Sequence, residues 1–132
     1  MFYTYIKQYY TFTEKDKNEA VKMLNQFLSV SMICREEGIL GLENLETENP
    51  YLKKAIELIV DGVDEKIISE IFEKYIIFGN HTSLEVLELL LIKEGAAAVS
   101  RGDATNIIYL KLAPFIGIEE NQNIYKEFTD NK

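Results

Sequence analysis

Few residues in this sequence have the types and spacing that catalysis or metal binding requires. The single histidine, His81, falls in a predicted loop without an adjacent acidic residue. The single cysteine, Cys34, is followed by Glu36 and Glu37, whose charges would oppose a thiolate. Ligands at a metal-binding spacing, a phosphate-binding loop and a nucleophile elbow are all absent. We therefore expect no enzyme activity, no metal site and no cofactor.

Two aspartates, Asp61 and Asp64, are the nearest approach to a paired-carboxylate or cation site. Gly62 lies between them, and helical patterns precede and follow them. Asp61-Gly62 is typical of a helix end, because glycine readily adopts the left-handed conformation there. Asp64 is a good N-cap for the next helix. The sequence thus favours turn and cap roles for these residues.

The most unusual stretch is residues 32–46, where two glycines and several charges interrupt an apolar helical pattern. A glycine within a helix costs roughly 1 kcal/mol relative to alanine, so Gly38 and Gly41 predict a kink, a close helix contact or a break. In one alternative the helix continues and another helix approaches closely along a stripe of small residues, namely Ser31, Cys34, Gly38 and Gly41. In the other, Gly38 ends the helix and residues 39–45 form a separate short one.

Composition narrows the kind of partner. The chain has 132 residues, of which 47% are hydrophobic and 27% charged, as is ordinary for one globular domain. Its net charge of −8 argues against nucleic acid or an anionic membrane as the main partner. No run approaches the roughly 18 apolar residues of a membrane-spanning helix, and no signal peptide is recognisable. We expect a soluble, cytoplasmic protein that binds other proteins.

The apolar spacing predicts an all-α fold, a compact bundle of about five to six helices in a single domain. Residues 1–12 are crowded with aromatics and predict an extended or irregular arm, which either covers the helical body or docks a partner. A long helix begins after Thr13, its predicted N-cap, and kinks or breaks near Gly38. Its apolar face includes Ala20, Met23, Leu24, Phe27 and Leu28 at three- and four-residue steps.

Capping residues mark the later helices. Asn49 caps a helix that starts at Pro50, and the helix after Asp64 turns its apolar face inward, with Ile67, Ile68, Ile71, Phe72, Tyr75 and Ile76. Ser83 is expected to cap a strongly apolar, central helix that extends to Val99.

The last predicted helix spans residues 104–112. Gly102 closes the preceding helix, Asp103 caps this one, and Pro114 with Gly117 ends it. Residues 119–132 predict one frayed turn in a C-terminal tail.

Three segments resemble the cytoplasmic loop of the flagellar stator subunit MotA. Residues 35–43 are similar to the pattern R-x-x-G-[IL]-L-x-L-E, residues 49–55 to [DN]-P-[FY]-L-x-x-G, and residues 58–64 to a V-D-G-x-D turn. Ala55 stands where the second pattern has glycine, which suggests a packing adjustment. The resemblance covers residues 12–76.

A weaker resemblance begins at residue 84. Residues 86–95 and 101–112 are similar to the family's C-terminal tail, and only residues 77–83 stand where the family has its third and fourth membrane helices. The chain thus resembles a stator cytoplasmic domain without its membrane part. Ion conduction, which resides in the membrane helices, is not implied.

The resemblance implies a binding surface for the rotor protein FliG or a similar partner. The family's key arginine aligns with Arg35 and its key glutamate with Glu43, and Glu36 and Glu46 complete the partner-binding set. On a continuous helix Arg35 and Glu43 would lie about 80° apart and border one face. The alternative is an ordinary solvated charged surface.

Two further functions remain open. A stand-alone helical adaptor would have lost the motor role and would form a homodimer through the aromatic N-terminal arm and exposed apolar surface. A small enzyme or ligand-binding bundle would have a polar pocket near His81.

Overall fold

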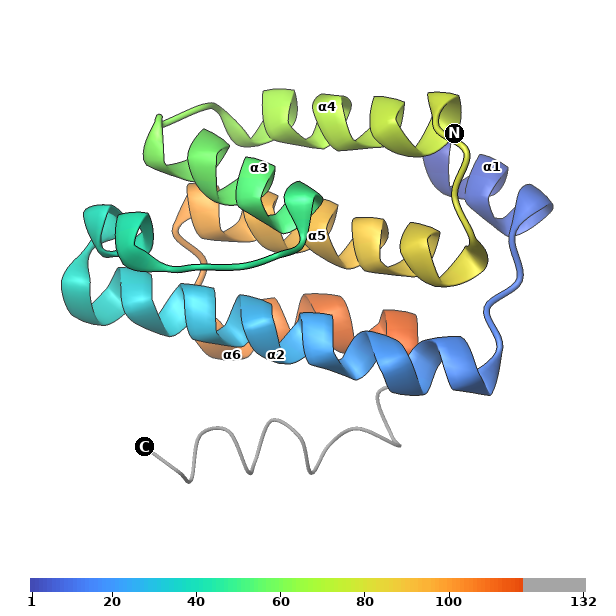
Figure 1. Ribbon diagram of the computed structural model, residues 1–132, viewed down its shortest axis with the longest axis horizontal. Coiled ribbons are helices and arrows are strands. Elements are labelled where there is room, and N and C mark those ends of the chain that lie inside the picture. Colours follow the sequence, from blue (N-terminus) through green and yellow to red (C-terminus); the bar gives the residue numbers. More distant parts are fainter. Residues whose placement is uncertain (118–132) are drawn as a thin grey trace.

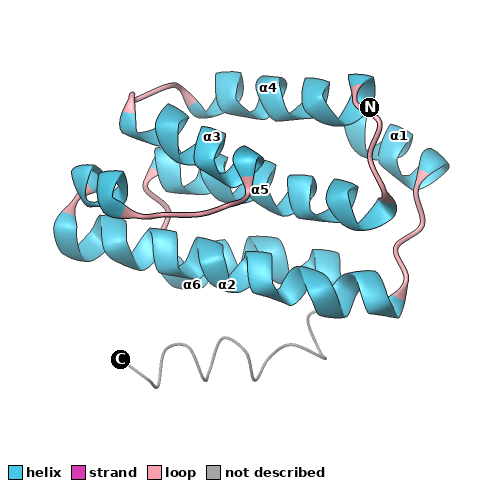
Figure 2. Cartoon of the chain, in the orientation of Figure 1, coloured by secondary structure: helices cyan, strands magenta, loops and turns pink. Residues whose placement is uncertain are grey.

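The computed structural model describes residues 1–117, and within them the chain forms six α-helices, two short 3-10 helices and no strand (Figures 1 and 2). The all-α prediction is therefore confirmed, while the predicted turn in residues 119–132 lies outside the described residues. The elements are α1 (Phe2–Tyr9), α2 (Glu14–Glu37), η1 (Ile39–Asn44), α3 (Pro50–Val60), α4 (Glu65–Phe78), α5 (Ser83–Arg101), α6 (Thr105–Leu112) and η2 (Ala113–Ile116).

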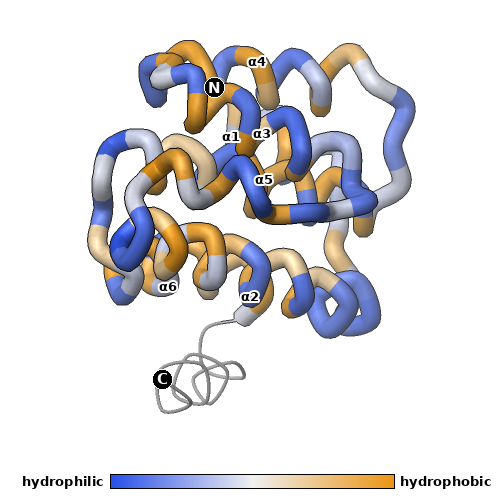
Figure 3. The backbone as a smooth tube through the Cα atoms, turned by 60° about the vertical axis from the view of Figure 1, so that its left-hand side comes forward, coloured by the Kyte–Doolittle hydropathy of each residue, from blue (hydrophilic) through white to orange (hydrophobic). Residues whose placement is uncertain are grey.

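Helix α5 is the centre of the bundle, as its apolar sequence predicts. It packs against α2, α3, α4 and α6, and Figure 1 shows it between the α3–α4 pair and α2. In Figure 3 hydrophobic and hydrophilic colours alternate along the helices of the bundle. Its buried residues spread around the whole helix: Val86, Leu87, Leu89, Leu90, Leu91, Ile92, Lys93, Gly95, Ala96, Ala97, Ala98 and Val99.

Helices α2 and α5 approach closely at Gly95. A Cβ atom at this position would lie 2.6 Å from Cδ1 of Phe27, whose side chain is completely buried. Gly95 is therefore needed for space and not for a special backbone conformation. One alternative from the sequence placed a close helix contact along the stripe of Ser31, Cys34, Gly38 and Gly41. In the structure α2 ends at Glu37, so the two glycines are not part of it, while Ser31 contacts α6 through a 2.7 Å hydrogen bond with Thr105.

Helix α2 ends at Glu37, and Gly38 follows with φ = 81°. Of the two alternatives for this stretch, the structure has the helix end and a separate short helix, η1, instead of a kink within a continuous helix. Gly41 lets η1 fold back closely, because a Cβ there would lie 2.8 Å from Cβ of Glu37.

Most predicted helix starts are confirmed. Thr13 and Asp16 form a reciprocal capping box on α2, and the Asn49 side chain accepts hydrogen bonds from two backbone N–H groups ahead of α3. Asp64 accepts from the backbone N–H of Lys66 at the start of α4, and Gly62 before it has φ = 74°.

Two predicted caps are wrong by one residue. The N-cap of α5 is Thr82, not Ser83; the Ser83 hydroxyl instead donates to Asp16, 2.7 Å away on α2. The N-cap of α6 is Ala104, not Asp103. In both cases the side chain that was expected to cap bonds to another side chain instead: Ser83 to Asp16, and Asp103 to Arg101 and Lys111.

Residues 1–12 are not an extended or irregular arm, because α1 occupies Phe2–Tyr9. Phe2, Tyr5 and Ile6 recur at three- and four-residue steps, which brings them to one helical face. Ile6 is buried, and Phe2 and Tyr5 pack against the core. A helical period therefore explains why the aromatic pattern fits a strand poorly.

One other predicted position differs. Ile67 was expected to face inward but is 50% exposed, since Ile68, Phe72 and Ile76 form the buried face of α4.

Among the described residues, no helix has both the length and the apolar character needed to cross a membrane.

We expect Gly95→Ala to destabilise the protein, because the new methyl group collides with the Phe27 ring. Overpacking costs roughly 1–3 kcal/mol, which exceeds the roughly 1 kcal/mol that alanine gains over glycine in a helix. Urea unfolding measures the change. In a Phe27→Leu background the same substitution becomes neutral or stabilising; an equal loss in both backgrounds would contradict the assigned contact.

Asp103 predicts an acid-dependent contribution to stability. Arg101 Nη2 and Lys111 Nζ lie 2.8 and 2.6 Å from Asp103 Oδ2, and Arg101 also pairs with Glu65 of α4. Hydrogen bonding to Arg101 lowers the pKa of Asp103 to about 2, against desolvation and with help from Lys111.

A carboxylate whose folded-state pKa is lowered stabilises the fold above its unfolded pKa and loses that contribution as pH falls. Asp103→Asn should therefore cost up to about 1 kcal/mol at pH 7, the range of surface ion pairs, and only a small part of that near pH 2, where the folded carboxyl is half protonated. Unfolding curves from pH 7 to 2 test this against Asp61→Asn, outside the network. A pH-independent difference would refute the prediction.

Candidate interaction site

The four residues predicted to bind a partner lie around the end of α2. Arg35 and Glu36 belong to its last turn, Glu43 to η1 and Glu46 to the segment after η1, and all four are exposed. Figure 1 shows η1 folded back beside the end of α2, at the left of the molecule. The structure thus brings the predicted residues to one end of the bundle.

Arg35 and Glu43 do not share one helix face, contrary to the prediction from the sequence, because α2 stops between them. Arg35 lines a cavity of about 240 Å³ with Arg101 and Asp103. Glu43 lines another, of about 360 Å³, with Lys53 and Asp61 on the side of α3. A partner would have to bridge η1 to contact both residues.

Two apolar residues between these charges were not singled out from the sequence. Ile39 and Leu40 of η1 are 43% and 68% exposed. The sequence did contain a signal for this exposure, since two apolar residues directly follow Gly38, which ends the helix. A short 3-10 helix that folds back on α2 has little surface on which to bury both of them. We call Arg35, Glu36, Ile39, Leu40 and Glu43 the helix-end patch.

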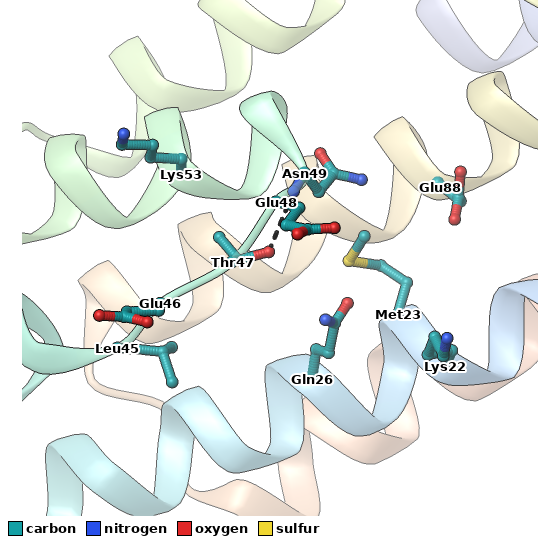
Figure 4. Close-up of a pocket in the computed structure, with 10 residues that line it drawn as sticks. All are labelled: Lys22, Met23, Gln26, Leu45, Glu46, Thr47, Glu48, Asn49, Lys53 and Glu88. Atoms are coloured by element: carbon teal, nitrogen blue, oxygen red, sulfur yellow. Dashed lines mark hydrogen bonds between the residues drawn. The ribbon is translucent and has the colours of Figure 1, made fainter.

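A groove of about 800 Å³ runs beside residues 45–49 (Figure 4). Its lining comes from α2, residues 45–49, α3 and α5: Lys22, Met23, Gln26, Leu45, Glu46, Thr47, Glu48, Asn49, Lys53 and Glu88. Of the predicted residues only Glu46 is among them. The other lining residues come from four parts of the chain, so no local sequence pattern connects them.

Sequence reasoning also missed a buried lysine on α5. The Lys93 side chain is 5% exposed and its Nζ lies 2.9 Å from Glu94 Oε2, 3.4 Å from Glu73 Oε2 and 3.2 Å from the Tyr3 hydroxyl. It also lies 5.0 Å from the ring centroid of Phe2. A lysine within the apolar run of a predicted central helix was the signal that could have revealed it.

The surroundings of Lys93 attach α1 to the bundle. The Tyr3 hydroxyl donates to Glu94, and burial followed by this hydrogen bond raises the pKa of Tyr3. Burial alone would raise the pKa of Glu94, but the hydrogen bonds from Tyr3 and Lys93 lower it overall. The charges of Lys93, Glu73 and Glu94 pair with one another, so we infer that this cluster holds α1 against α4 and α5.

His81 and Cys34, the two residues with side chains suited to catalysis, lie in unremarkable surroundings. His81 Nε2 lies 2.9 Å from the backbone oxygen of Tyr75, and its ring packs edge-on against Tyr51. Cys34 is half-buried, and this burial raises its thiol pKa. In residues 1–117 no group of three or more histidines, cysteines and carboxylates is arranged to hold a metal ion.

Comparison with known proteins gives no family assignment. No protein-family model matches the sequence, and comparisons with curated proteins and with solved structures find no match. The resemblance to MotA therefore rests on the residues quoted above.

We expect Tyr3→Phe to loosen α1 specifically. The substitution removes the hydroxyl that bonds to Glu94 and Lys93, and a hydrogen bond to a charged group contributes about 1.5–3 kcal/mol when buried. Tyr3 is 39% exposed, so we expect a smaller loss of about 1 kcal/mol. Amide hydrogen exchange should show faster exchange in Phe2–Tyr9 and little change in α5.

Tyr9→Phe is the matched control, because Tyr9 is 64% exposed and no hydrogen bond of its hydroxyl is seen in residues 1–117. Equal exchange rates in α1 for the two variants would refute the role assigned to the Tyr3 hydroxyl.

Proposed function

We propose that this chain is a non-enzymatic, cytoplasmic protein-interaction domain, similar to the cytoplasmic part of MotA, that binds a FliG-like rotor protein or another motility-related partner. The observation that carries the proposal is the helix-end patch. Its apolar centre, Ile39 and Leu40, is exposed and bordered by Arg35, Glu36 and Glu43.

The patch has the composition of a small protein-binding surface. Apolar side chains that a partner buries supply much of the binding energy at interfaces, whereas charges at the rim mainly set orientation and association rate. Leu40 is the obvious anchor because it is the more exposed of the two apolar residues. Glu36 and Glu43 favour a partner surface with basic residues.

The MotA resemblance adds the kind of partner. Arg35 and Glu43 occupy the positions of the family's rotor-contacting arginine and glutamate, and both side chains are exposed. A rotor protein with complementary charges would contact them on the two sides of η1. No motor activity follows from this, because force generation in that family requires membrane helices.

We expect Leu40→Ala to weaken binding of the purified FliG-type protein from the same organism at least tenfold. Arg35→Glu and Glu43→Lys should each slow association several-fold at low salt and less at 0.5 M salt, because salt screens exposed charges. Biolayer interferometry measures both rates.

Leu110→Ala and Glu70→Lys are the matched controls, since both residues are exposed and lie outside the patch. Circular dichroism must show that every variant is folded. If FliG does not bind, or if the patch variants bind like the controls, the proposed function is wrong.

The alternative is a stand-alone helical adaptor that forms a homodimer. The observation in its favour is a second exposed apolar pair at the end of α4, where Ile77 is 37% and Phe78 84% exposed. Light scattering distinguishes the two functions, because a dimer that Phe78→Ser dissociates, in the absence of FliG binding, supports the adaptor.

A further inference from the structure

Helix α4 lies at the edge of the bundle and packs mainly against α5 (Figure 1). Its inner face buries Ile68, Phe72 and Ile76. Its outer face carries two exposed apolar residues near its two ends, Ile67 and Phe78, and Phe78 is among the most exposed hydrophobic residues of the described chain. This outer face therefore has apolar surface at both ends of the helix.

Four residues form a continuous line along this outer face. Ile67, Ile71, Lys74 and Phe78 follow one another at steps of four, three and four residues, which is the spacing of a seam between two packed helices. At 100° per residue they lie within about 60° of one another around the helix. Lys74 is exposed and Ile71 is partly exposed. We call these four residues the α4 stripe.

The α4 stripe is symmetric about its own midpoint, which falls between residues 72 and 73. Ile67 and Phe78 are equally far from that midpoint, and so are Ile71 and Lys74. A two-fold interface requires a self-complementary surface, in which each residue contacts a different residue of the other copy. An antiparallel pair of α4 helices meets this requirement, because Ile67 then packs against the partner's Phe78 at both ends of the contact.

The charges on this face are complementary in the same arrangement. Glu70 is exposed and lies beside the stripe, almost as far from the midpoint as Lys74. Antiparallel pairing therefore places Glu70 next to the partner's Lys74, twice in each dimer. Parallel pairing would place each charge next to its own copy, and like charges repel. The order of the charges thus favours the antiparallel arrangement.

We propose that two copies of this chain associate through antiparallel, two-fold packing of α4 on α4. Ile67 packs against the partner's Phe78, and Glu70 pairs with the partner's Lys74. The contact uses no residue of the helix-end patch, which comes from α2 and η1. The proposal therefore does not rest on FliG binding, and it specifies how the homodimer of the alternative function forms.

The dimer should be weak. Helix α4 has 14 residues, and a contact between two helices of this length falls below the roughly 1,200–2,000 Å² buried in standard stable interfaces. Two copies with a net charge of −8 also repel each other at long range. We therefore expect a dimer that forms at high protein concentration and dissociates on dilution.

Charge exchange tests the proposed pairing on the full chain. Glu70→Lys and Lys74→Glu each bring like charges together, so each should raise the dissociation constant of the dimer at least fivefold. The double variant Glu70→Lys/Lys74→Glu exchanges the two charges and should restore self-association. Sedimentation velocity over a hundredfold range of concentration measures the dissociation constant. A chain that is monomeric throughout, or a double variant that stays monomeric, would overturn the proposal.

Disulfide cross-linking tests the antiparallel direction. In a Cys34→Ser background, which removes the single native cysteine, Ile67→Cys and Phe78→Cys proteins are oxidised with oxidised glutathione, separately and as a mixture. Residues 67 of the two copies would lie about 16 Å apart along the helix axes, beyond the roughly 7 Å that a disulfide spans between Cα atoms. We expect cross-linked dimers only in the mixture. Equal cross-linking of each variant alone would contradict the arrangement.

Two control variants separate this contact from the other surfaces. Leu110→Ala, on the exposed part of α6, should leave the dissociation constant of the dimer unchanged. Leu40→Ala should weaken FliG binding but not self-association, whereas Glu70→Lys should do the opposite, so that failure of FliG binding and failure of dimerisation are distinguishable. If Leu110→Ala dissociates the dimer and Lys74→Glu does not, another surface joins the copies and the proposal fails.

Discussion

The contact between the Phe27 ring and the backbone of Gly95 sets the distance between α2 and α5, and the rest of the bundle depends on that distance. Helices α3 and α4 pack on α5, and α6 packs on both α2 and α5. Ala96, Ala97 and Ala98, which follow Gly95 on α5, are also buried. Because protein interiors are close-packed, a single added methyl group at this point affects several helices at once.

Charges in this protein fall into two groups with different roles. Lys93, Arg101 and Asp103 are held in ion pairs that connect α4, α5 and α6, and Lys93 also donates a hydrogen bond to Tyr3 of α1. The helix-end patch has exposed charges beside an exposed apolar pair, Ile39 and Leu40. The ion-paired residues hold the fold, whereas the charges of the helix-end patch lie on the proposed binding surface.

The helix-end patch and the groove beside residues 45–49 are neighbours because α2 ends at Gly38. Gly38 ends α2, η1 then folds back, and the chain crosses to α3 through residues 45–49. The reversal exposes Ile39 and Leu40 on η1, and the crossing forms one wall of the groove. A kink in a continuous helix would have produced neither surface.

The sequence by itself determined the helical class and most helix ends. Thr13, Asn49 and Asp64 cap their helices through hydrogen bonds to backbone groups two or three residues away, and so short a range is visible in the sequence. The apolar residues of α1 do recur at a helical period, but the many aromatic residues in residues 1–12 made that period difficult to recognise.

Only the tertiary structure decided which of the small, charged and polar residues meet. The hydrogen-bonded pairs Tyr3–Lys93 and Ser31–Thr105 are 90 and 74 positions apart in the sequence. Ser83, which was expected to cap a helix, instead donates to Asp16, 67 positions away. Such contacts depend on how whole helices pack, and no local pattern records that packing. For the same reason the sequence around Gly38 left a kink and a helix end both open. The choice between them, the exposure of Leu40 and the separation of Arg35 from Glu43 required the folded chain.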